Sequence, residues 1–173
     1  MKNIKKIKKF LNTYNLDAYI IPKNDEFFNE YAFPNRLKTI SNFSGSAGFS
    51  IITKSLNYLF VDGRYLIQSK LESGKNFKII EIPYKYPKDV LNSDYHNKIG
   101  YDPKLFTLKT LKKYFELKFQ LVPINTNLVD QIYLEKEKKI KNFFKINDRY
   151  AGESVTSKIN RLFKILKKNR TDT

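Results

Sequence analysis

Residues 44–65 read SGSAGFSIITKSLNYLFVDGRY. Within this stretch, two β-rich runs, FSIIT at 49–53 and YLFV at 58–61, are separated by a short polar turn. Apolar and aromatic runs that stand this close together favour a β-hairpin. The glycine-rich SGSAG predicts a turn before the hairpin, and Asp62 is well placed to cap a helix that begins near Arg64. We therefore expect a hairpin that is followed directly by a helix.

Further β-rich runs lie on both sides of this hairpin. They are DAYII at 17–21, FKIIEI at 77–82, KIGY at 98–101 and FQLV at 119–122. Helical patterns alternate with them: apolar residues recur every three or four positions in Lys2–Tyr14 and again in Thr107–Lys118. Residues 23–43 are expected to form loops and short helical turns. This alternation predicts an α/β fold in which a mixed β-sheet is flanked by helices.

The composition changes after the last of these strands. We assign residues 1–133 to a first domain, residues 134–150 to a charged linker and residues 151–173 to the start of a second, truncated domain. A helix is predicted over Glu153–Lys168, with apolar residues on one face. The residues of this face that we expect to dock a partner are Ile159, Leu162, Phe163 and Leu166. Little of the sequence remains to cover them.

Composition excludes several classes of protein. The 173 residues suit one globular domain rather than two full-sized ones. With no cysteine, the chain has no disulfide, no catalytic thiolate and no thiolate zinc site. The single histidine, His96, excludes a pair of histidine ligands and is expected at the surface. No apolar run approaches the roughly 18 residues of a membrane helix. We expect a soluble cytoplasmic protein without a membrane partner.

The formal net charge of +16 raises the alternative of nucleic-acid binding. Lysines are spread along the whole chain, however, and the densest run, Lys2–Lys9, has the spacing of a solvated helix face. We do not expect nucleic acid as the partner, and we keep a basic nucleic-acid-binding module as the alternative function.

The motifs that could bind a ligand also have structural interpretations. SGSAG could cradle a phosphate, but a strand follows it where a phosphate loop requires a helix, so a turn is the favoured interpretation. Arg64 follows a strand end, where α/β folds place ligand contacts. Its alternative is an internal ion pair with Asp25, Glu26 or Glu30. Arg36 is expected to form a polar cluster with the same acids, Asp25 and Glu30.

Several segments together resemble the N-terminal region of Xaa-Pro aminopeptidase (aminopeptidase P), a metallopeptidase family. The segments are the stretch from DAYII to FSIIT at 17–53, LFVDGRYLIQ at 59–68, IGYDP at 99–103 and DRYAGESVTSKINRL at 148–162. The resemblance implies the ribonuclease H-like topology of the creatinase/prolidase N-terminal domain. In this family a separate pita-bread domain binds two divalent metals, commonly manganese, and hydrolyses the bond before a proline at the second position.

The resemblance also implies that this chain is inactive alone. Its dispersed acids and lone histidine do not supply a two-metal site, so we expect no catalytic residue, no metal ligand and no cofactor here. We expect a non-catalytic domain that contributes to substrate access, domain packing or oligomerisation, with the remaining peptidase domains or a second copy of itself as partner. The candidate cleft or interdomain residues are Asp62, Arg64, Tyr65, Arg36, Asp25 and Glu30. A functionless remnant of a shortened gene is the last alternative.

Overall fold

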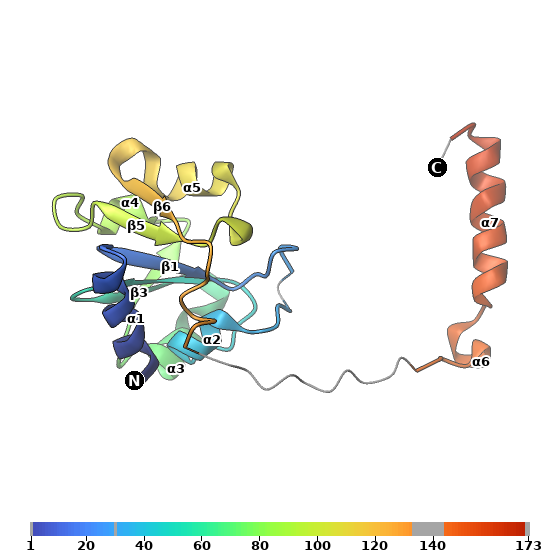
Figure 1. The fold of residues 1–173 in the computed structure, drawn as a ribbon. Coiled ribbons are helices and arrows are strands. Elements are labelled where there is room, and N and C mark those ends of the chain that lie inside the picture. The colour runs from blue at the N-terminus through green and yellow to red at the C-terminus, as the bar shows by residue number, and fades with distance from the viewer. Residues whose placement is uncertain (1, 30, 133–143, 172–173) are drawn as a thin grey trace. The chain divides into compact units, whose positions relative to one another are not determined.

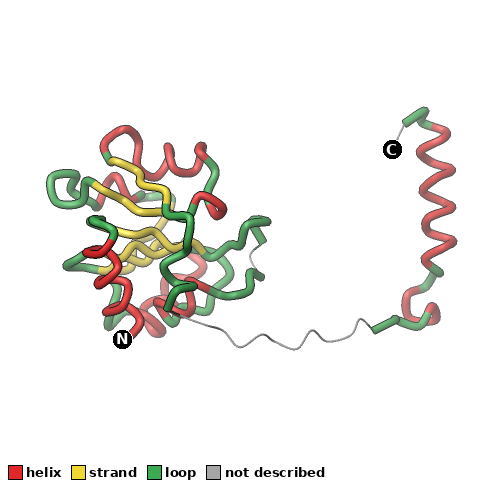
Figure 2. The backbone as a smooth tube through the Cα atoms, viewed as in Figure 1, coloured by secondary structure: helices red, strands yellow, loops and turns green. Residues whose placement is uncertain are grey.

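The computed structural model describes residues 2–29, 31–132 and 144–171. The chain divides into two compact units, residues 1–136 and 137–173. The first unit is built on one six-stranded sheet, and the described part of the second contains two helices, α6 (Asp148–Ala151) and α7 (Val155–Lys168). Figure 2 shows the strands gathered in the first unit. The α/β fold expected from the sequence is confirmed.

The sheet contains both parallel and antiparallel pairs. Its strands are β1 (Ala18–Pro22), β2 (Phe49–Thr53), β3 (Asn57–Asp62), β4 (Lys78–Ile82), β5 (Lys98–Tyr101) and β6 (Gln120–Pro123), in the order β4-β3-β2-β1-β5-β6. Strand β2 runs antiparallel to β1 and β3, which confirms the predicted hairpin, and the other neighbours are parallel. All strands except β2 therefore end at the same edge of the sheet, which we call the carboxyl edge.

Helices cover both faces of the sheet. They are α1 (Lys2–Thr13), α2 (Arg36–Ser41), α3 (Leu66–Ser73), α4 (Pro87–Val90) and α5 (Leu108–Phe115), with short 3₁₀ helices η1 (Gly63–Tyr65), η2 (Pro103–Leu105) and η3 (Glu116–Lys118). Helices α1, α2 and α3 lie on one face, and α4 and α5 lie on the other (Figure 1). The short helix α4 was not among the elements expected from the sequence.

Strand β1 shows why the core has two halves. Its alternate side chains point to opposite faces. Tyr19 and Ile21 enter the cluster that α1 and α2 cover, while Ala18 and Ile20 enter the cluster that α5 covers. Because every residue of β1 is buried, an uninterrupted apolar run was the correct signal for a central strand.

Helix α1 confirms the amphipathic pattern predicted at the N-terminus. Ile4, Ile7 and Leu11 are buried, and the lysines at positions 5, 6 and 9 are exposed. The helix carries no acidic residue to pair with its lysines. Burial of its apolar stripe is therefore what stabilises it.

A segment that we call the strap, residues 124–132, follows β6. It runs back past β1 toward α2 (Figure 1), and its Ile124, Leu128 and Val129 are buried in the cluster beneath α1 and α2. Within the described part of the chain, no helix is both long enough and apolar enough to span a bilayer.

Candidate functional site

The carboxyl edge collects four of the six candidate cleft or interdomain residues, namely Asp25, Asp62, Arg64 and Tyr65. The strand ends that meet there are Pro22, Asp62, Ile82, Tyr101 and Pro123, together with Phe49 at the start of the antiparallel β2. The loops leaving this edge carry Asp25, Arg64 and Tyr65. Because ligands of open α/β sheets bind outside the carboxyl ends of strands, this edge is the first place to look for a site.

Asp62 and Arg64 form an exposed pair at the end of β3. Asp62 caps η1 by accepting from the Arg64 backbone N–H at 3.0 Å, which confirms the predicted cap. Its carboxylate also accepts from Arg64 Nε at 3.1 Å and Nη2 at 2.8 Å. The hydrogen bond from the Arg64 side chain lowers the pKa of Asp62 below its ordinary value. The Arg64 side chain stays 73% exposed, and its guanidinium lies over the Tyr65 ring.

The ion pair recorded for Arg64 is therefore not the one we expected with Asp25 or Glu26. A carboxylate two residues earlier in the same turn reaches the guanidinium without ordering a distant loop, which explains the local pairing. Glu30, the third expected partner, lies outside the described residues.

The SGSAG segment is a turn, as predicted, and a side chain at either of its glycines would clash with neighbouring atoms. A Cβ on Gly45 would lie 2.2 Å from the Phe43 ring. Gly48 has a φ of +145°, and a Cβ there would meet the Phe60 carbonyl oxygen at 2.7 Å. Ser46 Oγ is hydrogen-bonded to the Tyr65 hydroxyl at 2.8 Å. This hydrogen bond links the turn to the η1 segment.

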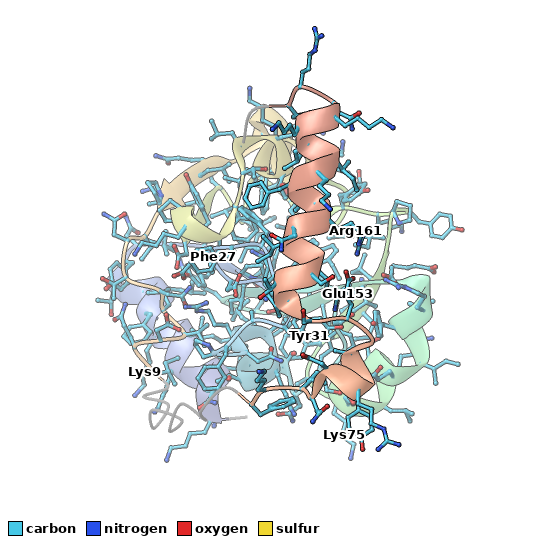
Figure 3. All side chains as sticks on the ribbon, turned by 90° about the vertical axis from the view of Figure 1, so that its right-hand side faces the viewer. Lys9, Phe27, Tyr31, Lys75, Glu153 and Arg161 are labelled. Atoms are coloured by element: carbon cyan, nitrogen blue, oxygen red, sulfur yellow. The ribbon has the colours of Figure 1, made fainter. Side chains whose placement is uncertain are left out.

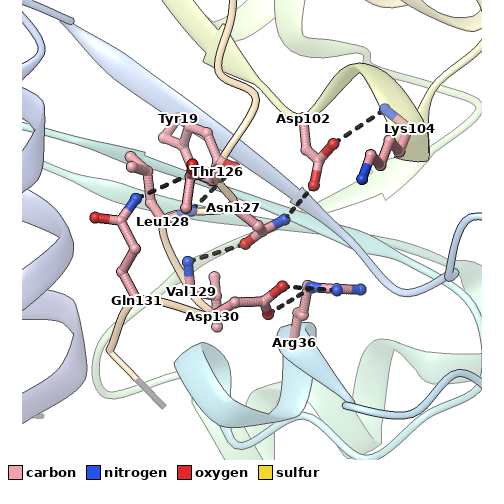
Figure 4. Close-up of polar contacts among 10 residues, drawn as sticks. All are labelled: Tyr19, Arg36, Asp102, Lys104, Thr126, Asn127, Leu128, Val129, Asp130 and Gln131. Carbon is pink, nitrogen blue, oxygen red and sulfur yellow. Dashed lines mark hydrogen bonds and ion pairs between the residues drawn. The ribbon is translucent and has the colours of Figure 1, made fainter. Parts of the chain in front are cut away.

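Arg36 forms a bidentate ion pair, but with a different acid from those expected. Its Nε and Nη2 donate to the two carboxylate oxygens of Asp130, each at 2.8 Å (Figure 4). The expected partner Asp25 instead accepts from the backbone N–H groups of Phe27 and Asn29, each at 2.9 Å, and shapes its own loop. The cluster of Arg36 with Asp25 was therefore a wrong prediction, and Glu30 again lies outside the described residues.

Further polar contacts hold the strap against the sheet (Figure 4). Asp102 accepts from the Asn127 side chain at 2.9 Å and from the Lys104 N–H at 3.0 Å. The Asn127 side-chain oxygen accepts from the Val129 N–H, and the buried Tyr19 hydroxyl accepts from the Leu128 N–H. Burial raises the pKa of Tyr19 above its ordinary value. This network keeps the strap in one position.

Sequence reasoning missed Tyr19, Asp102, Asn127 and Asp130. Arg36 and Asp130 are 94 positions apart, so no local spacing could pair them. The available signal was the arginine itself, because a buried arginine requires a carboxylate partner.

The described residues contain no group of three or more histidine, aspartate and glutamate side chains arranged to hold a metal ion. His96 is half-buried rather than fully at the surface, and its Nδ1 lies 3.1 Å from the Asn92 carbonyl oxygen. Residues 2–29, 31–132 and 144–171 therefore offer no ligand set for a two-metal centre.

Aromatic side chains are exposed in the loops of the carboxyl edge. Phe27 and Tyr31 in the loop after β1 are 83% and 80% exposed (Figure 3), and Tyr84, which follows β4, is 79% exposed. Phe28 and Phe33 of the same loop as Phe27 are about half exposed. Exposed rings gathered in this way are typical of interaction surfaces.

The second unit presents the apolar face that the sequence predicted. Ser154 caps α7 by accepting from the Ser157 N–H, and Glu153 accepts from Arg161 Nη2 at 3.1 Å (Figure 3). Three of the four docking candidates, Ile159, Leu162 and Phe163, are exposed, and Leu166 is half-buried. Val155 and Ile165 extend the exposed apolar surface.

Comparison with known proteins gives a consistent result. The sequence model of the creatinase/prolidase N-terminal domain matches residues 3–132. A probable Xaa-Pro aminopeptidase P of Fusarium vanettenii is 32% identical over 95% of this chain, and Xaa-Pro aminopeptidase 1 of Dictyostelium discoideum is 28% identical over 99%. The chain spans only 29% and 30% of the lengths of these two relatives.

Solved structures show the same fold. The X-prolyl aminopeptidase of Caenorhabditis elegans, described as a cytosolic enzyme with a di-nuclear active site, matches 98% of this chain and 31% of its own, with a TM-score of 0.67 at 23% identity. The N-terminal domain of the cytoplasmic peptidase PepQ from Mycobacterium tuberculosis matches 76% of this chain and 98% of its own, with a TM-score of 0.60 at 20% identity. The chain belongs to the creatinase/prolidase N-terminal domain family and is a domain of the aminopeptidase P and prolidase type.

Proposed function

We propose that this chain is the non-catalytic N-terminal part of an Xaa-Pro aminopeptidase. The observation that carries the proposal is the match of nearly the whole chain to less than a third of relatives that bear this name. The remaining length, which we call the catalytic part, holds the two divalent metals, manganese by family resemblance, and cleaves the bond before proline.

Within the enzyme, the carboxyl edge serves substrate access. The exposed guanidinium of Arg64 and the neighbouring Tyr65 and Asp62 stand at this edge, and an arginine is suited to binding a peptide carboxylate. Arg36 and Asp25 serve a different purpose: they fix the strap and the loop after β1 respectively.

The second unit serves domain packing. A helix with one apolar face obtains most of its stability from packing. The apolar face of α7 is therefore expected to pack against another surface through Ile159, Leu162, Phe163 and Leu166. In this proposal that surface belongs to the catalytic part or to a second copy of this chain. We place the enzyme in the cytoplasm, in line with the cytosolic description of the similar C. elegans enzyme.

A chimera tests this function. The chain replaces the matched N-terminal stretch of the D. discoideum relative, and hydrolysis of a tripeptide with proline at its second position is measured with manganese. We expect the chimera to cleave the peptide and the 173-residue chain alone to be inactive. A second chimera that carries an unrelated basic domain of similar size controls for non-specific rescue.

Two results would contradict the proposal. One is cleavage by the purified 173-residue chain. The other is a chimera that melts cooperatively, as the native relative does, and yet shows none of the relative's activity.

A further inference from the structure

A groove opens in the carboxyl edge between the loop after β1, the turn before β2 and helix α5. It consists of two adjoining cavities of about 280 and 210 Å³ that share Asn24, Phe28, Gly48, Phe49 and Tyr114 as lining residues. We call it the edge groove. All its walls belong to the first unit.

The groove lies where the strand order of the sheet reverses. From β1 the chain continues to β2 on one side, while β5 lies on the other side and runs parallel to β1. Loops that leave such neighbouring strands in opposite directions open a crevice that binds ligands in many α/β proteins. Pro22 at the end of β1 and Leu105 and Phe106 after β5 form the two sides here.

The lining suits an apolar ring. Phe28, Phe49, Phe106 and Tyr114 contribute aromatic surface, and the rings of Phe49 and Tyr114 are stacked with centroids 4.5 Å apart. Either cavity alone is smaller than the roughly 300 Å³ at which pockets for small-molecule ligands and cofactors begin. The aromatic lining that the two cavities share suits the flat ring of one polypeptide side chain.

The backbone holds Phe28 at the groove in an unusual conformation. Its φ is +58°, a region that bulky residues avoid and that is concentrated at binding sites. The Phe28 N–H donates to the Asp25 carbonyl at 3.1 Å, and the Asp25 carboxylate accepts from both flanking N–H groups. Asn24 Nδ2 donates to the Leu105 carbonyl at 3.1 Å, so the loop is tied to the opposite wall.

Helix α5, which forms one wall, is basic. It carries Lys109, Lys112 and Lys113 and no acidic residue. Lys113 Nζ lies 4.9 Å from the centre of the Tyr86 ring, and that ring stacks on Tyr114 of the groove. Across residues 2–29, 31–132 and 144–171, none of these three lysines has a recorded ion pair. Helix α5 lines the groove through Thr110 and Tyr114. Carboxylates on an occupant that extends beyond the groove along α5 would complement its exposed lysines.

We propose that the edge groove is a socket for one aromatic side chain carried on an acidic segment of the catalytic part. This inference rests on the proposed function, in which the catalytic part, about 70% of the length of the relatives, packs against this domain. Aromatic side chains seated in well-packed pockets are enriched among interface hot spots. The exposed Phe27, Tyr31 and Tyr84 lie in loops of the same edge and would be available to cover the bound segment.

A tryptophan peptide tests the socket, since the chain contains no tryptophan and the peptide's fluorescence is therefore free of background. Acetyl-Asp-Trp-Asp-amide is titrated into the 173-residue chain, and its anisotropy and emission maximum are followed. We expect saturable binding with a blue shift, at least fivefold tighter than that of acetyl-Lys-Trp-Lys-amide.

Two variants test whether the peptide binds in the groove. Thr110→Phe fills the groove from α5 and Phe28→Ala removes one wall, and each should weaken peptide binding at least tenfold. Leu71→Ala, at an exposed position on α3, is the matched control and should leave it unchanged.

The proposal is overturned if no saturable signal is seen up to about 5 mM peptide. Equal binding to the wild type and to both groove variants, each with an unchanged urea midpoint, overturns it as well, and so does equal binding of the lysine peptide. Calorimetry on the chimera tests the occupant: the catalytic part should block the groove and weaken peptide binding at least tenfold, and undiminished binding contradicts this assignment. An inactive chimera with intact peptide binding to the isolated chain refutes only the proposed function.

Discussion

Asp17 shows how one carboxylate can join three parts of the sheet. Its Oδ2 accepts from the Lys98 N–H at 3.0 Å, and its Oδ1 accepts from Lys54 Nζ at 3.1 Å. Burial raises the pKa of Asp17, but the hydrogen bonds from Lys98 and Lys54 outweigh burial, so the pKa lies below its ordinary value of 3.8. The folded state therefore prefers the ionised form.

The sign of the resulting pH dependence follows from linkage. A carboxyl whose pKa is lower in the folded state stabilises the fold above its unfolded pKa, and this stability is lost as the pH falls through the folded pKa. We expect Asp17→Asn to cost about 1 kcal/mol near pH 6 and much less near pH 2. Urea midpoints across this range measure the effect. Asp94 is exposed, and across the described residues no hydrogen bond or ion pair is recorded to its carboxylate. Asp94→Asn is therefore the control, and an equal pH dependence in both variants would refute the role of Asp17.

At the scale of elements, the strap is the feature with the clearest energetic test. Arg36 is 10% exposed and paired with Asp130 in the strap, whereas Arg64 is 73% exposed and paired with Asp62. We expect Arg36→Gln to lower the free energy of unfolding by about 2 kcal/mol, because a charge-assisted pair next to the core is lost. Arg64→Gln should cost less than about 0.5 kcal/mol. Chemical denaturation compares the two, and equal effects would show that the strap is not held by this pair.

The elements themselves were largely predictable because their signals are local. FSIIT and KIGY correspond to β2 and β5 without a change of boundary, and the helix after Asp62 begins with the predicted cap. The strap was not predictable: Ile124 and Leu128 stand four positions apart, as in a helix, but residues 124–132 form bends and turns instead. The edge groove was also hidden, since its walls come from segments as distant as Pro22 and Tyr114. Only the pairing order of the strands brings such segments together.

At the scale of the whole molecule, the division into two units predicts that the first folds alone. Both halves of its core are built from residues up to Ile132, and a similar domain from M. tuberculosis was solved as a chain of matching extent. We expect residues 1–132 to unfold cooperatively, with a stability within about 0.5 kcal/mol of the first transition of the full chain. Urea unfolding followed by circular dichroism measures this. A truncated chain without a cooperative transition would mean that the second unit is needed for folding.

The strap also determines how the domain responds to mechanical load. The edge strand β6 has four residues, and a pull applied directly at its end could peel it from β5 one hydrogen bond at a time. Tension from beyond residue 132 instead reaches the Arg36–Asp130 pair and the Tyr19–Leu128 contact first. We therefore expect tension applied beyond residue 132 to break these contacts near α2 before β6 separates from β5.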